Sequence, residues 1–152
     1  MTRKLLFGAV ALALGCAAGV GPSPLYHNYF LSAVDGDPLP VPFAEDGSEL
    51  IASSLGFGPG GRPRVPGPSA GTVNYTVIVR QADGSQQHST VQLDYAVSDG
   101  TLVINLCPPL ALCIVQTELV GPILGPTDEL VLTHYLAGNP GSVYRFFPTL
   151  PD

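Results

Sequence analysis

The sequence predicts an all-β protein, a small antiparallel up-and-down β-barrel of about eight strands. After residue 22, no stretch keeps an apolar period of 3.6 residues for three helical turns. Short runs instead alternate apolar and polar residues, which is typical of half-buried strands, and clusters of Gly, Asp, Asn and Pro separate them. Eight sequential antiparallel strands can close into a small barrel without exposed edges. A two-sheet sandwich has the same periodicity and remains an alternative.

The middle of the chain carries the clearest strand signals. The runs 72–80 (TVNYTVIVR) and 89–98 (STVQLDYAVS) each alternate so that one face would be buried. The residues on these faces are Val73, Tyr75, Val77, Val79, Val91, Leu93, Tyr95 and Val97. Asp-Gly pairs at 83–84 and 99–100 are hairpin-turn signals, and the second pair leads into TLVINL at 101–106. These runs predict a β-meander.

Five further runs complete the predicted eight strands. They are 25–34, 49–57, 111–119, 129–137 and 142–147, each bounded by turn-forming residues. In the stretch 56–71, ten of sixteen residues are Gly or Pro. We interpret this stretch as a surface linker between strands, with a functional loop at a barrel mouth as the alternative. Residues 25–152 are predicted to form one domain, long enough for a real core.

Residues 1–15 have the layout of a secretory signal peptide. Arg3 and Lys4 form a positive region, and an apolar run from Leu5 to Leu14 follows. This run is short and diluted by glycine for a membrane span, and Pro22 and Pro24 would end a helix. We therefore expect export and removal of this segment.

Cys16 ends the run ALGC, which resembles the lipobox of bacterial lipoproteins, where a cysteine after small residues is lipidated and becomes the first residue. The resemblance implies that Cys16 carries a lipid anchor and that 16–24 is a tether. Several acyl chains on one residue anchor a protein firmly. Ordinary cleavage after Ala17 or Ala18, which would release a soluble secreted protein, is the alternative. The expected location is the cell envelope.

The charge of the chain is acidic, with a net charge of −6. Beyond the predicted signal peptide there are four arginines and no lysine against twelve carboxylates. Such a chain has no basic stripe for a phosphate backbone and no polybasic patch for anionic lipid headgroups. We therefore exclude nucleic acid as a partner and expect the membrane to be contacted through the lipid anchor.

Cys107 and Cys113 flank PPLAL at the junction of two predicted strands. In an exported protein, two cysteines around a short loop are typical of a disulfide. Free thiols and a metal site are the alternatives, although zinc would need more ligands at regular spacing. We predict the disulfide and no metal.

Three sequence patterns resemble catalytic or ligand-binding motifs, but the residues around each do not support that function. GPSAG (67–71) matches the G-x-S-x-G of serine hydrolases, but Ser69 precedes a predicted strand instead of a helix. The glycine-rich 56–61 precedes no helix and lacks a P-loop lysine. The carboxylates between Asp35 and Glu49 fit turn chemistry better than a calcium loop. We predict neither an enzyme nor a cofactor.

If the barrel holds a ligand, its inward faces favour a small apolar molecule. The candidate contacts are Tyr75, Val77, Leu93, Tyr95, His134 and Arg145. His134 and Arg145, on the last two predicted strands, would orient a ligand if their faces point inward. The structural alternative for both is a satisfied core or rim group.

The run YFLSAVDGDPLP (29–40) resembles the start of small lipocalin-like bacterial lipoproteins of unknown function, in which an opening strand leads into V-[D/N]-G-x-P-L-P. The matching residues are Tyr29, Leu31, Val34, Asp35, Gly36, Pro38, Leu39 and Pro40, then Asp99 to Leu102 and Val143 to Arg145. The resemblance spans residues 25 to 146 and implies a lipocalin-like barrel without catalytic residues. The insert 56–71 and CPPLALC depart from the family pattern.

These observations lead to two competing functional expectations. The first is an exported, lipid-anchored barrel that binds a small apolar ligand. The second is a structural or protein-interaction lipoprotein of the envelope with a filled core and no ligand. A cavity in the barrel would favour the first, and a filled interior would favour the second.

Overall fold

The computed structural model describes residues 28–57, 69–109, 111–123 and 129–148, and this part of the chain is all-β, as predicted. It contains ten strands and no helix. The strands are β1 (Asn28–Val34), β2 (Asp37–Pro38), β3 (Val41–Pro42), β4 (Glu49–Phe57), β5 (Ser69–Arg80), β6 (Gln86–Ser98), β7 (Thr101–Asn105), β8 (Thr117–Pro122), β9 (Leu130–Leu136) and β10 (Asn139–Pro148). The predicted signal peptide and tether, residues 1–24, lie outside the described residues.

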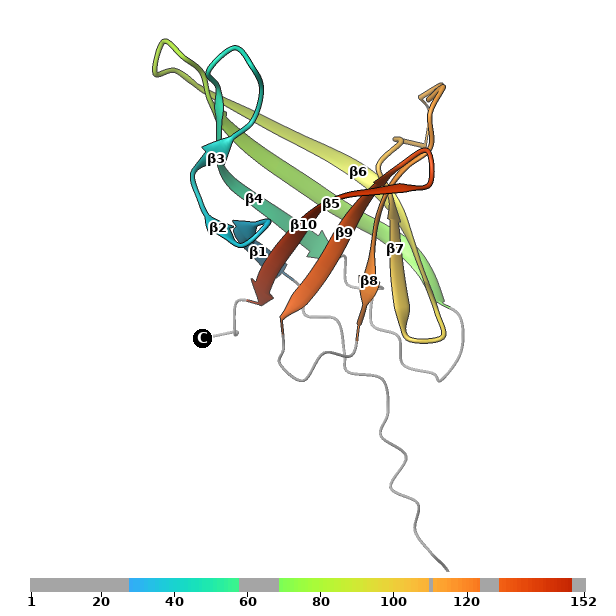
Figure 1. Ribbon diagram of the computed structural model, residues 1–152. Helices are drawn as coiled ribbons and strands as arrows, with labels where there is room; N and C mark the ends of the chain where they lie inside the picture. Colours follow the sequence, from blue (N-terminus) through green and yellow to red (C-terminus); the bar gives the residue numbers. More distant parts are fainter. Residues whose placement is uncertain (1–27, 58–68, 110, 124–128, 149–152) are drawn as a thin grey trace, which may run out of the picture.

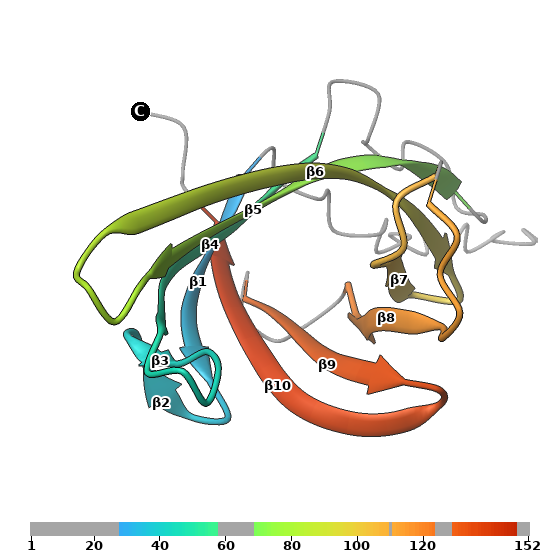
Figure 2. The ribbon, with the colours of Figure 1, turned by 90° about the horizontal axis from the view of Figure 1, so that it is seen from above.

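Eight of these strands close into an antiparallel barrel. Sheet neighbours follow the order β1-β10-β9-β8-β7-β6-β5-β4, and β4 pairs again with β1. Figure 2 shows the strands arranged around the barrel axis. The short β2 and β3 are added beside β1 and β4. This closure confirms the predicted up-and-down barrel, consistent with a lipocalin-like fold, and rules out the sandwich alternative.

Most predicted strands agree with the structure, but the run 111–119 does not. Residues 111–116 are loop, and β8 begins only at Thr117. Leu112 and Ile114 are fully exposed, so alternation in this run did not reflect a buried face. The predicted linker was also too long at both ends, because Gly56 and Phe57 end β4 and Ser69 opens β5. Residues 58–68 lie outside the described residues.

The two ends of the barrel differ in their connections. We call the end that holds Asn28, the β6–β7 turn and Pro148 the closed end. The opposite end, which we call the mouth, holds the β1–β2, β3–β4, β5–β6, β7–β8 and β9–β10 connections. In Figure 1 the mouth is at the top, and the β5–β6 hairpin projects from it.

Apolar side chains fill the closed end. Tyr29, Phe57 and Tyr95 form two edge-to-face aromatic pairs with ring centroids 5.9 and 5.3 Å apart. The largest side chains that are less than 2 % exposed come from the inward faces of the strands: Phe146, Leu55, Leu93, Leu102, Ile104, Leu119, Leu130, Leu132 and Val73. The alternation of each strand puts these residues inside, so the core is a packed plug.

Two glycines make this packing possible. A Cβ on Gly71 would lie 2.9 Å from the ring of Tyr95, its cross-strand partner, so the ring lies directly over the glycine. A Cβ on Gly121 would overlap the carbonyl oxygen of Val131. A larger residue at either position would therefore force strands or side chains apart.

Two-residue hairpin turns connect several strands. In the Asp99–Gly100 turn both residues have positive φ, 51° and 75°, as the Asp-Gly signal predicts. The β9–β10 turn has the same form, but its first residue is Ala137, at φ 50°. Alanine has no side-chain hydrogen bond to favour this left-handed conformation, so this turn is strained.

We expect Ala137→Asn to raise the free energy of unfolding by about 1 kcal/mol, because asparagine tolerates a left-handed backbone and alanine does not. Denaturant unfolding at neutral pH measures the change. Ala82→Asn is the matched control, since Ala82 lies in another mouth turn but does not have a positive φ. An equal gain in both variants would show that the backbone conformation of residue 137 is not the cause.

Candidate functional site

A cleft of about 360 Å³ lies at the mouth, between the inward face of the β5–β6 hairpin and the turn 43–48 that joins β3 to β4. Its apolar lining consists of Phe43, Ala44, Tyr75, Val77, Val79 and Val91. Its polar lining consists of Asp46, Ser48, Gln81, Gln87 and Ser89. Figure 2 shows the β3–β4 turn beside the projecting hairpin. The cleft thus has an apolar wall and a polar rim.

The cleft exists because the barrel opens toward the mouth along two seams. β6 pairs with β7 only through Tyr95 to Ser98, so no β7 residue pairs with β6 from Gln86 to Asp94. β1 pairs with β4 only up to Phe30 and Ser54. The inward face of the hairpin is therefore covered on one side by the turn 43–48, and the space between them is left open.

Hydrogen bonds fix the shape of the turn 43–48. The Phe43 N–H donates to the Ser48 carbonyl oxygen at 2.9 Å, and the Ser48 N–H donates to the Asp46 carboxylate at 2.9 Å. The Ser48 side chain and N–H hold the pKa of Asp46 below its ordinary value. Asp46 is therefore a carboxylate at neutral pH, and its position at the cleft is set by the turn.

Polar side chains continue from the cleft into the barrel. Ser53 is buried, and its hydroxyl donates to the Thr76 carbonyl oxygen at 2.9 Å. Burial raises the pKa of Tyr75, which is hydrogen-bonded to Ser53. Burial and the Asp35 carboxylate raise the pKa of Tyr144, whose ring meets His134 edge-on at 6.5 Å. Both phenols are therefore neutral groups at the level where the packed core ends.

A second hollow of about 320 Å³ adjoins the cleft at Phe43, which lines both. Its walls come from β1, β2 and the turn between them, from β3, β4 and β10, and they include Asp35, Asp37 and Tyr144. Two further carboxylates thus lie near the mouth, beside the one in the cleft.

Of the ligand-binding residues predicted from the sequence, some line the cleft, some are buried in the core, and some do neither. Tyr75 and Val77 line the cleft. Leu93 and Tyr95 are 0 % and 4 % exposed in the packed core, so they support the barrel floor. His134 shares the inner face with its cross-strand partner Leu119 and contacts Tyr144.

The inward orientation considered for Arg145 is wrong. Its neighbours Tyr144 and Phe146 take the inward positions of β10, and alternation sends Arg145 outward. There its guanidinium is 3.3 Å from the Glu129 carboxylate. The turn 43–48 was not predicted from the sequence as part of the site. Continuing the alternation of β6 from Val91 through Ser89 to Gln87 would have identified the polar part of the lining.

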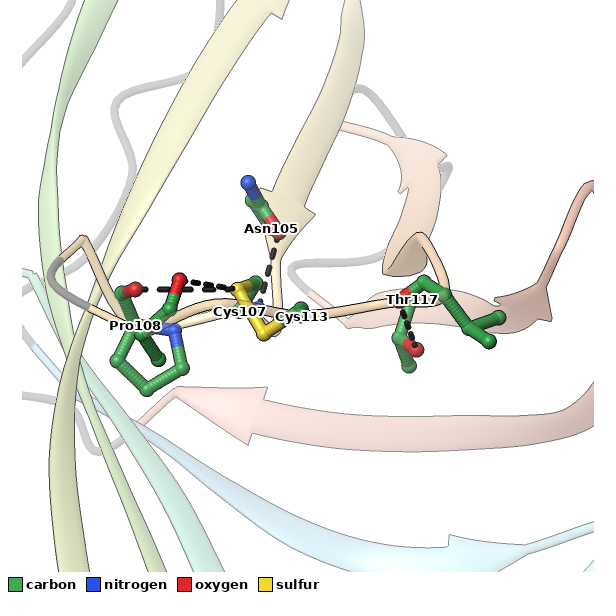
Figure 3. Close-up of a disulfide and its surroundings, with 7 residues drawn as sticks. Asn105, Cys107, Pro108, Cys113 and Thr117 are labelled. Atoms are coloured by element: carbon green, nitrogen blue, oxygen red, sulfur yellow. Dashed lines mark hydrogen bonds between the residues drawn. A yellow bond between two sulfur atoms is a disulfide. The ribbon is translucent and has the colours of Figure 1, made fainter.

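The predicted disulfide joins Cys107 and Cys113 across the β7–β8 loop, with Cα atoms 5.9 Å apart (Figure 3). The Asn105 side-chain oxygen accepts the Cys107 N–H at 2.9 Å, which fixes the loop entry. Leu112 in this closed loop and Ile114, the residue after Cys113, are exposed to solvent. The β7–β8 connection therefore carries exposed apolar residues at the mouth, apart from the cleft lining.

Within the described ranges, no three or more His, Cys, Asp or Glu side chains gather as a metal site. In the same residues, no helix has the length and apolar character needed to cross a bilayer. Comparisons with protein-family models, curated proteins and solved structures found no match. The structure itself shows an eight-stranded antiparallel barrel with a packed closed end and a cleft at its mouth.

Asp35 connects the β1–β2 turn to β10. The Val143 N–H donates to its carboxylate at 2.7 Å, and its own N–H donates to the Val143 carbonyl oxygen at 2.8 Å. The Val143 and Ser142 hydrogen bonds hold the pKa of Asp35 below its ordinary value of 3.8. The Asp35 carboxylate therefore joins the β1–β2 turn to β10 next to the register shift of β10 between Pro140 and Val143.

We expect Asp35→Asn to lower stability at neutral pH, with a loss that disappears in acid. A carboxyl whose pKa is lower in the folded state stabilises above its unfolded pKa of about 3.8 and loses this effect as pH falls through the folded pKa. Denaturant midpoints of both proteins at several pH values below 6 would measure the difference. Asparagine is the substitution of choice because it tolerates the left-handed backbone of residue 35. A difference in denaturant midpoint that stays constant across this pH range would contradict the role of the charge.

Proposed function

We propose that the protein binds a small, largely apolar molecule in the mouth cleft, without transforming it. The observation that carries this proposal is the cleft of about 360 Å³, whose apolar wall is formed by β5 and β6 and whose rim is polar. Small-molecule sites are typically concave and mostly apolar, with a few polar groups that orient the ligand, and barrel mouths are common places for them. The cleft volume lies within the usual range of such sites.

The lining residues favour binding over chemistry. In the part of the chain that the structure describes, the cleft lining offers serine hydroxyls, glutamine amides and one carboxylate, and no histidine, cysteine or lysine to act as a base or nucleophile. Tyr75, Val77 and Val91 of the wall pack against the buried core, so part of the binding surface is already in place before a ligand arrives.

Val77→Trp should weaken binding strongly because the larger side chain would fill the cleft that Val77 lines. The probe is the neutral apolar dye N-phenyl-1-naphthylamine, whose fluorescence rises when it leaves water. Ile78→Trp is the matched control, because alternation places Ile78 on the opposite face of β5. We expect saturable binding by the wild type and Ile78→Trp and at least about tenfold weaker binding by Val77→Trp. Equal binding by Val77→Trp would overturn the site.

We further propose that the barrel is exported and held in the cell envelope by a lipid on Cys16. The disulfide supports an oxidising compartment. It pairs two of the three cysteines, which leaves Cys16 available. β1 begins at the closed end, so a tether that leads into Asn28 would reach the barrel opposite the mouth. The resemblance to lipocalin-like lipoproteins agrees with this arrangement.

Mass spectrometry of the mature N-terminus tests the anchor. We expect an acylated Cys16 and recovery of the protein with membranes. Cys16→Ala should be recovered in the soluble fraction or as the uncleaved chain, whereas the double variant Cys107→Ala/Cys113→Ala should remain with membranes. An unmodified terminus at Ala18 or Gly19 would contradict lipidation and indicate ordinary signal cleavage.

A second candidate function, a protein-interaction module, is favoured by one observation. Leu112 in the disulfide-closed loop and Ile114 directly after it are fully exposed, and exposed apolar residues gathered at one place can mark an interaction site. This function would not need the cleft. Filling the cleft with Val77→Trp would therefore leave such an interaction intact.

A further inference from the structure

We propose that the mouth cleft selects amphiphiles with a positively charged ammonium head over those with a carboxylate head. This inference rests on the proposed binding function and specifies the polar end of the ligand. Three features of the described residues carry it: the charge in the cleft lining, the placement of the arginines, and the aromatic side chains beside the charge.

Among the described residues that line the cleft, Asp46 is the one with a charged side chain. Its carboxylate is held in place by the Ser48 N–H, and it carries its charge at neutral pH because those hydrogen bonds favour the ionised form. The other polar groups in the lining are neutral serine, glutamine and tyrosine side chains. The adjoining hollow adds Asp35 and Asp37, so the potential at this side of the mouth is negative.

The described arginines are on the outer surface and already have partners. Arg80 forms an ion pair with Glu49, its cross-strand partner on β4. Arg145 is paired with Glu129. His134 is on the inner face but lines neither hollow. A carboxylate head in the cleft would thus lose hydration and face Asp46, and the described part of the lining supplies no compensating cation.

Phe43 and Tyr75 provide aromatic surface in the same cleft as Asp46. Aromatic rings attract cations, and quaternary ammonium groups are commonly recognised by aromatic side chains. Phe43 is 56 % exposed, so its ring is accessible to a head group at the rim. The valines behind it would contact the apolar tail. The cleft therefore offers a place for both ends of a cationic amphiphile.

Three amphiphiles with the same dodecyl chain test this selectivity: dodecyltrimethylammonium, dodecanol and dodecanoate. Each would displace N-phenyl-1-naphthylamine from the wild-type protein at concentrations below those at which micelles form. We expect the ammonium compound to bind at least about tenfold more tightly than dodecanoate, with dodecanol between them. The preference should weaken as salt concentration rises, because exposed charges are screened.

Asp46→Asn should bring the ratio of ammonium to dodecanoate affinities, both measured in this variant, to about one, because the asparagine side-chain oxygen can still accept the Ser48 N–H but carries no charge. Asp83→Asn is a closely matched control. Asp83 accepts the Ser85 N–H at 2.8 Å in the same kind of turn, but it does not line the cleft. We expect Asp83→Asn to keep the wild-type order of affinities.

The outcomes separate this inference from the function on which it rests. If the wild type binds no dye, the proposed binding function itself is wrong. If it binds dye but dodecanoate competes as well as the ammonium compound, the head-group selectivity is wrong and the binding function stands. Equal losses of ammonium affinity in Asp46→Asn and Asp83→Asn would show that general surface charge, and not Asp46, causes the preference.

Discussion

The pairing of β1 with β4 is the constraint on which the rest of the structure depends. Three residue pairs, Asn28–Gly56, Tyr29–Leu55 and Phe30–Ser54, turn an open sheet into a barrel and remove two long edges. The pairing ends there, and both strands have register shifts just beyond it. Beyond this point β1 pairs with β2 and β4 pairs with β3, so the two strands no longer pair with each other. The barrel is consequently tight at one end and open at the other.

Because of this asymmetry, the interior of the barrel differs between the closed end and the mouth. At the closed end the aromatic contacts of Phe57 and the close approach at Gly121 show tight packing, and burial there stabilises the fold. Toward the mouth the inward face of β6 changes from Val97 and Leu93 to Ser89 and Gln87. The packed core and the cleft wall are thus parts of the same two strands. The apolar wall and the polar rim of the cleft follow from this change along β6.

Much of the fold could be predicted because its signals are local. Alternation in β4 marked Glu49–Phe57 correctly, and the Asp99–Gly100 pair identified its hairpin turn. The same kind of pattern was misleading at 111–116, where the disulfide closes a loop and Leu112 is exposed. A period of two also cannot say which face of an isolated strand is inside. Arg145 is outside because Tyr144 and Phe146 of the same strand pack into the core.

The sequence by itself determined the all-β class, the approximate number of strands, the turn positions and the cysteine pair, because periodicity, turn chemistry and cysteine spacing are read along the chain. Only the tertiary structure decided where the interior is filled and where it is hollow. That division depends on where the β1–β4 and β6–β7 pairings end, which is a relation between distant segments. Strand pairing also brings Phe43 and Asp46 to the same cleft as Tyr75 and Val77, although the two pairs of residues are about thirty positions apart in the sequence.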